Sequence, residues 1–188
     1  MSATQNILIL WTGPKHCGKT TGAAKLVHAA RDKGFNVAGV LALSLYHNSE
    51  LLGFDVVDLR NANQAPLARR TISETKAGAF AFIDNGLKLG NAALSAATTK
   101  SAELIIVDEF GPLELKAQGW RRNVDSLLVS SNAVILLVVR QELVDVVRQL
   151  YSEVPCRELA ATNPDSIDEV IRMLENRRHH IEEYNVQS

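Results

Sequence analysis

Hydrophobic positions along the chain fall into short continuous runs separated by segments of helical periodicity. Three runs, at 7–11, 104–107 and 133–139, are wholly apolar, which is typical of strands buried on both faces of a sheet. Because these runs alternate with helical segments, the pattern predicts an α/β fold, with a mostly parallel sheet between two helical layers. The expected helices lie near 20–33, 84–99, 120–129, 142–150 and 166–180.

Two further strand patterns, at 36–45 and 51–59, are separated only by the polar residues 46–50. A link this short predicts an antiparallel hairpin, which makes the sheet mixed. Residues 60–78 are rich in Asn, Ala, Arg, Thr and Lys, and we expect an irregular loop there. Shorter strands are expected at 79–83 and, at a sheet edge, at 155–159.

The segment 13–20, GPKHCGKT, matches the phosphate-loop pattern G-x-x-x-x-G-K-[ST] at every fixed position. It follows an apolar strand and opens a helix, as the pattern requires. Gly13 and Gly18 permit a close backbone approach, so that successive N–H groups can face phosphate oxygens. Pro14 has no N–H, and the cradle must therefore come mainly from residues 15–20.

Lys19 is expected to place its ammonium against the terminal phosphates, and the Thr20 hydroxyl to coordinate Mg²⁺. A bare glycine turn that binds nothing is the alternative, and the flanking strand and helix argue against it. The predicted nucleotide-binding residues are Gly13, Pro14, Lys15, His16, Cys17, Gly18, Lys19, Thr20 and Thr21.

Polar residues follow two other apolar strands. Asp108 and Glu109 come directly after 104–107, and Arg140 follows 133–139. Ligands of open α/β sheets bind at the carboxyl ends of the strands, where these side chains should gather. We expect Asp108 to help hold Mg²⁺ and Glu109 to orient or deprotonate an attacking water. Arg140 either stabilises charge on the transferred phosphoryl group or pairs with Glu142, and pairing is slightly favoured.

Composition bears on the number of domains, on nucleic-acid binding and on the location of the protein. The chain has 46% apolar and 22% charged residues and a net charge of −1, which indicates one globular domain over 1–188 and no bias toward nucleic acid. No apolar run is long enough to span a bilayer, and the N-terminus lacks a secretory pattern, so a cytoplasmic location is expected. Cys17 and Cys156 do not form a disulfide framework.

Three stretches together resemble the thermostable nucleoside-triphosphatase family of phosphate-loop proteins. They are GPKHCGKTT at 13–21, GFDVVDL at 53–59 and LIIVDEFGPLEL at 104–115. The resemblance covers roughly residues 7–140 and implies Mg²⁺-dependent hydrolysis of nucleoside triphosphates with a broad choice of base. Lys19, Thr20, Asp108 and Glu109 fall on the family's matching positions.

The chain departs from that family at two places. Ser49-Glu50-Leu51-Leu52 stands where an Arg is usual, and Pro112 stands where Lys is common. Both differences bear on base preference and turnover and leave the phosphate-binding core unchanged. The guanine-selecting pattern Asn-Lys-x-Asp is not matched by Thr162-Asn163-Pro164-Asp165, so the sequence does not choose between ATP and GTP.

Two other functions fit the same loop. A small-molecule kinase would need an acceptor pocket, to which Arg69, Arg70 and the 60–78 segment could contribute. A slow nucleotide-dependent switch would bind triphosphate and depend on a protein partner that the sequence does not identify.

Overall fold

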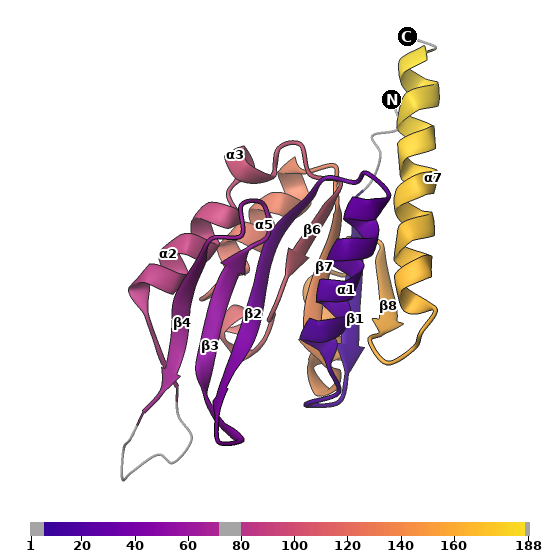
Figure 1. Cartoon of the computed structure of the whole chain (residues 1–188). Coiled ribbons are helices and arrows are strands. Elements are labelled where there is room, and N and C mark those ends of the chain that lie inside the picture. Colours follow the sequence, from indigo (N-terminus) through magenta and orange to yellow (C-terminus); the bar gives the residue numbers. More distant parts are fainter. Residues whose placement is uncertain (1–5, 72–79, 187–188) are drawn as a thin grey trace.

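The computed structural model describes residues 6–71 and 80–186 and has one eight-stranded sheet at its centre (Figure 1). The strand order is β5-β4-β3-β2-β6-β7-β1-β8. Five neighbouring strands, from β2 to β8 in that order, pair in parallel, and the other three extend the sheet in antiparallel fashion. The predicted mixed α/β sheet is therefore confirmed.

The parallel part of the sheet is built from the apolar runs of the sequence. Every residue of β6 and all but the last residue of β7 are buried, because helices cover both faces. The five parallel strands are β1 (Ile7–Gly13), β2 (Val37–His47), β6 (Leu104–Val107), β7 (Val134–Arg140) and β8 (Cys156–Ala160).

The antiparallel part begins with the predicted hairpin of β2 and β3 and continues through two more strands. The prediction of an irregular loop over 60–78 is wrong in part, because residues 64–70 form β4 and pair with β3. Residues 72–78 of that predicted loop lie outside the described residues. The three antiparallel strands are β3 (Glu50–Asp58), β4 (Gln64–Arg70) and β5 (Phe80–Phe82).

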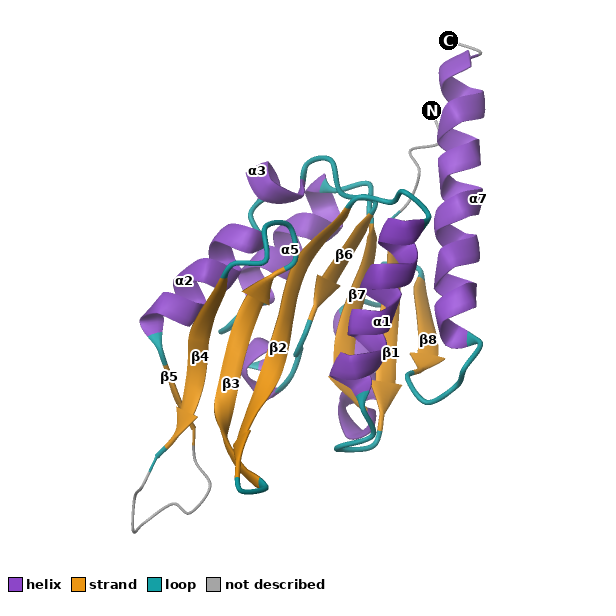
Figure 2. Ribbon diagram, in the orientation of Figure 1, coloured by secondary structure: helices purple, strands orange, loops and turns teal. Residues whose placement is uncertain are grey.

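Helices form a layer on each side of the sheet (Figure 2), which confirms the three-layer prediction. Alternate residues of β1 point into the two layers: Leu8 and Leu10 pack with α5 and α6, and Ile9 and Trp11 pack with α1 and α7. The helices are α1 (Lys19–Asp32), α2 (Asp84–Ala93), α3 (Ala96–Thr99), α4 (Pro112–Leu115), α5 (Arg121–Ser130), a 3₁₀ turn (Gln141–Leu143), α6 (Val144–Leu150) and α7 (Ser166–Val186).

Several helix boundaries differ from expectation. The helix near 84–99 is broken into α2 and α3, because the Ser95 side chain accepts from the Thr98 amide and starts a new turn. The N-cap residue of α2 is Ile83, and this end of the helix has no side-chain cap. The last helix continues to Val186, beyond the predicted end. None of the described helices is long and apolar enough to cross a bilayer.

Strand order decides where the functional residues meet. β7 lies between β1, which leads into the phosphate loop, and β6, which leads into the acidic pair. All three strands run in the same direction, so their carboxyl ends share one edge of the sheet, the lower edge in Figure 1. Gly13 is the register partner of Arg140, which brings the end of β7 next to the start of the loop.

Candidate nucleotide-binding and catalytic site

The phosphate loop leaves β1 at Gly13 and enters α1 at Gly18. A Cβ on Gly13 would lie 2.7 Å from Cys17 Sγ, so only glycine lets the loop fold back over itself. Gly18 has a φ of 87° and is the N-cap residue, with no side chain to bond the first amides of α1. The first turn of this 14-residue helix therefore presents N–H groups and a positive dipole end at the loop, as an anion requires.

The Lys19 ammonium holds the loop closed on itself. Its Nζ donates to the carbonyl oxygens of Gly13, at 3.0 Å, and of Pro14, at 2.8 Å. Pro14, which has no amide to offer, thus contributes an acceptor to the loop. Lys15 and His16 are exposed, and His16 has a φ of 62°, which places it at the outer bend of the loop. Lys19 is therefore poised within the loop, with carbonyl acceptors that phosphate oxygens can replace.

Trp11 lies directly beneath the loop. Its side chain is 1% exposed, and its Nε1 donates to the carbonyl of Lys19 at 3.1 Å. Gly22 makes room for the indole, since a Cβ there would lie 3.0 Å from Trp11 Cζ2. The Trp11 indole is therefore coupled to the backbone of the predicted nucleotide-binding residues.

The side chains of Asp108 and Thr20 contact each other. The Thr20 hydroxyl donates to the Asp108 carboxylate, and the Ala42 amide donates to Asp108 Oδ2 at 3.2 Å. Asp108 is only 2% exposed, and this burial raises its pKa to about 7 even though both hydrogen bonds oppose the shift. Because burial makes the ionised form of Asp108 unfavourable, a cation beside the carboxylate would stabilise that form.

The Asp108 carboxylate and the Thr20 hydroxyl are suitable ligands for Mg²⁺. The ion prefers hard oxygen ligands and keeps several waters, so that one carboxylate, one hydroxyl and substrate phosphates are a sufficient set. Among the residues that the structure describes, no cluster of three or more His, Cys, Asp or Glu side chains could hold a metal. A Mg²⁺ at Asp108 and Thr20 would thus depend on phosphate oxygens, which accords with a nucleotide-borne ion.

Glu109 is more exposed than Asp108 and pairs with Arg140. Arg140 Nε lies 2.6 Å from Glu109 Oε1, and both side chains are about one-third exposed. The expected pairing of Arg140 with Glu142 is wrong, because β7 delivers Arg140 to the space between the loop and the acidic pair. The two side chains assigned to chemistry at this edge neutralise each other in the free protein.

Glu114 supports this edge and was not identified from the sequence as a site residue. It is 4% exposed, and its carboxylate accepts from the amides of Gly111, at 2.9 Å, and Trp120, at 3.1 Å. Burial raises the pKa of Glu114 above its usual value. The carboxylate ties together both ends of the segment that follows Glu109. The sequence feature that could have identified Glu114 is its position in the LIIVDEFGPLEL stretch.

Two cavities, of about 430 and 540 Å³, lie at the opposite edge of the sheet, at the amino ends of β2, β6 and β7. Neither touches the phosphate loop. We place the reaction at the carboxyl edge nonetheless, because phosphates are held in an open cradle of backbone amides rather than in a deep cavity. The residues that can bind, coordinate and accept a proton are all at that edge.

A phosphate loop between β1 and α1, with an acidic strand one position removed from β1, defines the class as an α/β protein of the P-loop NTPase fold. The chain belongs to the NTPase family, whose model matches residues 8–172. That range includes the loop, the acidic pair and Arg140, and it extends well past the region that the sequence resemblance covered.

Relatives from archaea carry the same family name. The chain is 31% identical over 153 residues to the nucleoside-triphosphatase THEP1 of Methanopyrus kandleri, across 74% of this chain and 83% of that one. It is also 31% identical over 167 residues to the nucleoside-triphosphatase THEP1 of Archaeoglobus fulgidus, across 87% and 96%. The predicted resemblance is confirmed.

Two solved structures share the fold. One is a human cancer-related nucleoside triphosphatase, with a TM-score of 0.67 and 19% identity, across 92% of this chain and 98% of that one. The other is THEP1 from Aquifex aeolicus, with a TM-score of 0.64 and 21% identity, across 91% and 99%. The agreement supports the α/β architecture and the strand order that forms the site.

Proposed function

We propose that this chain is a nucleoside-triphosphate hydrolase that uses Mg²⁺, accepts several bases, and cleaves the β–γ phosphoanhydride bond. The observation that carries the proposal is the pairing of Glu109, a partly exposed carboxylate, with Arg140, which lies at the end of β7 next to the start of the phosphate loop. The family and the names of its relatives favour hydrolysis over transfer to an acceptor. Broad base choice rests on the family resemblance and on the missing guanine-selecting pattern.

The chemistry follows from the positions of the side chains. A water attacks the γ-phosphorus and passes a proton to Glu109, the bond to the bridging oxygen breaks, and the products are a nucleoside diphosphate and phosphate. Lys19 and the first amides of α1 offset negative charge on the phosphate oxygens. When bound at Asp108 and Thr20, Mg²⁺ supplies further charge stabilisation and helps to fix the triphosphate.

Arg140 is proposed to change partners during this cycle. In the free protein it is held by Glu109, whose Oε1 accepts a hydrogen bond from Arg140 Nε. An entering γ-phosphate offers Arg140 a more highly charged partner. Arg140 would then stabilise the transferred group as an arginine supplied by the same chain, and Glu109 would be free to accept the proton.

Phosphate release tests the proposal. We expect steady release from ATP, GTP, CTP and UTP in the presence of Mg²⁺ and none above background with EDTA. Lys19→Ala should lower kcat/KM by at least about a hundredfold, because it removes a charge aimed at the terminal phosphates. Lys25→Ala, an exposed lysine on α1 outside the site, is the matched control. Formation of nucleoside diphosphate only with an added acceptor, and without free phosphate, would identify a kinase instead.

Trp11 provides a separate readout of binding. Because its Nε1 bonds the Lys19 carbonyl, rearrangement of the loop around phosphates should change its fluorescence. We expect a saturable change on adding a non-hydrolysable triphosphate analogue with Mg²⁺, and loss of that change in Trp11→Phe but not in Trp120→Phe. Trp120 is buried among α2 and α5 residues. A saturable signal without any turnover would favour the switch over the hydrolase.

A further inference from the structure

The two cavities at the amino edge adjoin each other. The cavity of about 430 Å³ and the cavity of about 540 Å³ share Ser101 and Ala102, which lie just before β6. We call the joined space the amino-edge groove. Each half alone falls within the range of about 300–1,000 Å³ that ligand sites of small molecules occupy. The groove lies at the opposite end of the parallel strands from the phosphate loop.

The groove is strongly basic although the chain carries a net charge of −1. Only one carboxylate, Glu103, is among the residues that line its two halves. Five cationic side chains line the same space: Arg31, Arg60, Lys100, Arg177 and Arg178. Such separation of charge focuses a positive potential in a concave surface, which attracts anions.

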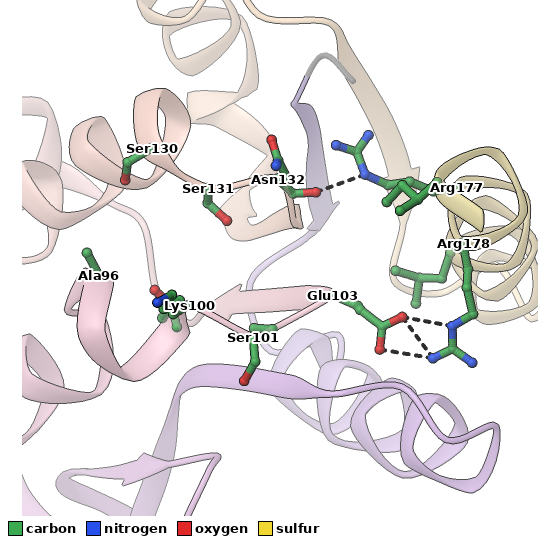
Figure 3. A pocket seen from close by; sticks show the side chains of 13 residues that line it. Ala96, Lys100, Ser101, Glu103, Ser130, Ser131, Asn132, Arg177 and Arg178 are labelled. Carbon is green, nitrogen blue, oxygen red and sulfur yellow. Dashed lines mark hydrogen bonds and ion pairs between the residues drawn. The ribbon is translucent and has the colours of Figure 1, made fainter. Parts of the chain in front are cut away.

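The single carboxylate is taken up by Arg178 and does not neutralise Arg31, Arg60 or Lys100. Both oxygens of Glu103 are engaged by Arg178, at 2.8 and 2.9 Å, and one also accepts from the Asn36 amide at 2.9 Å. Figure 3 shows this pair at one side of the cavity, with Lys100 and Ser101 across from Asn132. Among the described residues, no carboxylate pairs with the side chains of Arg31, Arg60 or Lys100.

Hydrogen bonds to backbone carbonyls hold three of the arginine side chains in place. Arg31 donates to the Leu59 carbonyl, and Arg60 donates to the Thr98 carbonyl at 2.9 Å. Arg177 is 9% exposed and donates to the Asn132 carbonyl at 2.9 Å. Each guanidinium has five donors, so one carbonyl leaves donors for a ligand on Arg31 and Arg60. Because these side chains are already held in place, less conformational entropy is lost when a ligand binds.

The remaining lining favours phosphate groups over bases or apolar chains. Ser101 and Ser131 add hydroxyl groups that can donate to phosphate oxygens. Phe35, the aromatic residue of the lining, is 4% exposed and lies beneath the Arg178 guanidinium, 4.0 Å from it, so it offers no face for base stacking. Single-stranded nucleic acid sites depend on such faces.

We infer that the amino-edge groove is a second binding site, for a small organic anion that carries phosphate groups and has the size of a mononucleotide to a dinucleotide. One anionic group would lie with Lys100 and the other with Arg31 and Arg60. This site is separate from the phosphate loop and stands whether or not the chain hydrolyses triphosphates.

The test uses pyrophosphate as the probe and amide NMR of the full chain carrying Lys19→Ala, which weakens the phosphate loop. We expect saturable shifts at Ser101 and Ala102. Arg60→Gln with Lys100→Gln should weaken that binding by at least about tenfold, since charge-assisted hydrogen bonds are lost. The matched control is Lys25→Gln with Arg122→Gln, two exposed cations outside the groove, and it should bind as the parent does.

Three outcomes would overturn the inference. They are the absence of saturable shifts at the groove, equal weakening by the control pair, and binding of a single-stranded oligonucleotide at the groove with no response to pyrophosphate. Because Arg60 also holds the Thr98 carbonyl, Lys100→Gln alone is the second variant, and it should weaken binding without changing the melting temperature. Turnover at the phosphate loop is scored separately in the chain with Lys19 intact.

Discussion

Glu109→Gln is expected to lower kcat for triphosphate hydrolysis by about 10²–10⁴-fold, the usual contribution of a general base, while triphosphate binding persists. The amide keeps the size of the side chain and loses the ability to accept the proton of the attacking water. Asp108, Thr20 and Lys19 are untouched, so the dissociation constant should stay within a few-fold of the parent. Single-turnover phosphate release and Trp11 fluorescence measure the two quantities separately.

Glu142→Gln is the matched control, because Glu142 is exposed at the start of the 3₁₀ turn and has no contact with the site chemistry. It should hydrolyse triphosphate at the parental rate. If Glu109→Gln also retained that rate, the carboxylate would not be the base, and a slow switch in which another group positions water would become the better description.

A second substitution, at Arg140, extends this experiment into a double-mutant cycle with Glu109. Arg140→Gln removes both the cation near the phosphate and the partner of Glu109, so we expect a loss of kcat with little change in binding of the diphosphate product. In the chain that carries both substitutions, the combined loss should be smaller than the product of the two single losses, because the residues act as a unit. Multiplicative losses would contradict the proposed exchange of partners.

Much of this site was visible in the sequence because each functional residue follows an apolar strand. Runs such as 104–107 and 133–139 predicted buried parallel strands, and parallel strands bring Asp108 and Arg140 to one edge whatever their order. The order itself was not predicted. It places β7 between β1 and β6, and only then does Arg140 face Glu109 rather than Glu142.

Other features could not be predicted from the local sequence alone. β4 contains Pro66 and polar residues, and it is a strand because it completes the pairing of β3 rather than because of its own propensity. Glu114 lies within the LIIVDEFGPLEL stretch, and only the fold shows that its buried carboxylate accepts from two backbone amides. The amino-edge groove combines residues from distant segments, and their charges meet only in the fold.

Asp108→Asn is expected to abolish Mg²⁺-dependent turnover and, in metal-free buffer, to make the protein more stable at alkaline pH. The pKa of Asp108 in the folded chain is about 7, above its usual value of 3.8, because burial penalises the charged form. As the pH rises, this carboxyl therefore ionises in the unfolded chain before it ionises in the folded one. Between the unfolded pKa and about 7, the parent loses stability that the variant keeps, because the amide of the variant carries no charge at any pH.

The difference between the two chains should be absent at acid pH, grow through that window, and level off above it at a value on the order of 4 kcal/mol. Thermal unfolding in EDTA across this range measures it, with Asp145→Asn, an exposed carboxylate, as the control. Adding Mg²⁺ and a triphosphate analogue should then raise the melting temperature of the parent far more than that of Asp108→Asn. A parent that is as stable as the variant at every pH would mean that Asp108 is held ionised by contacts other than a metal, and the case for Mg²⁺ at this carboxylate would be lost.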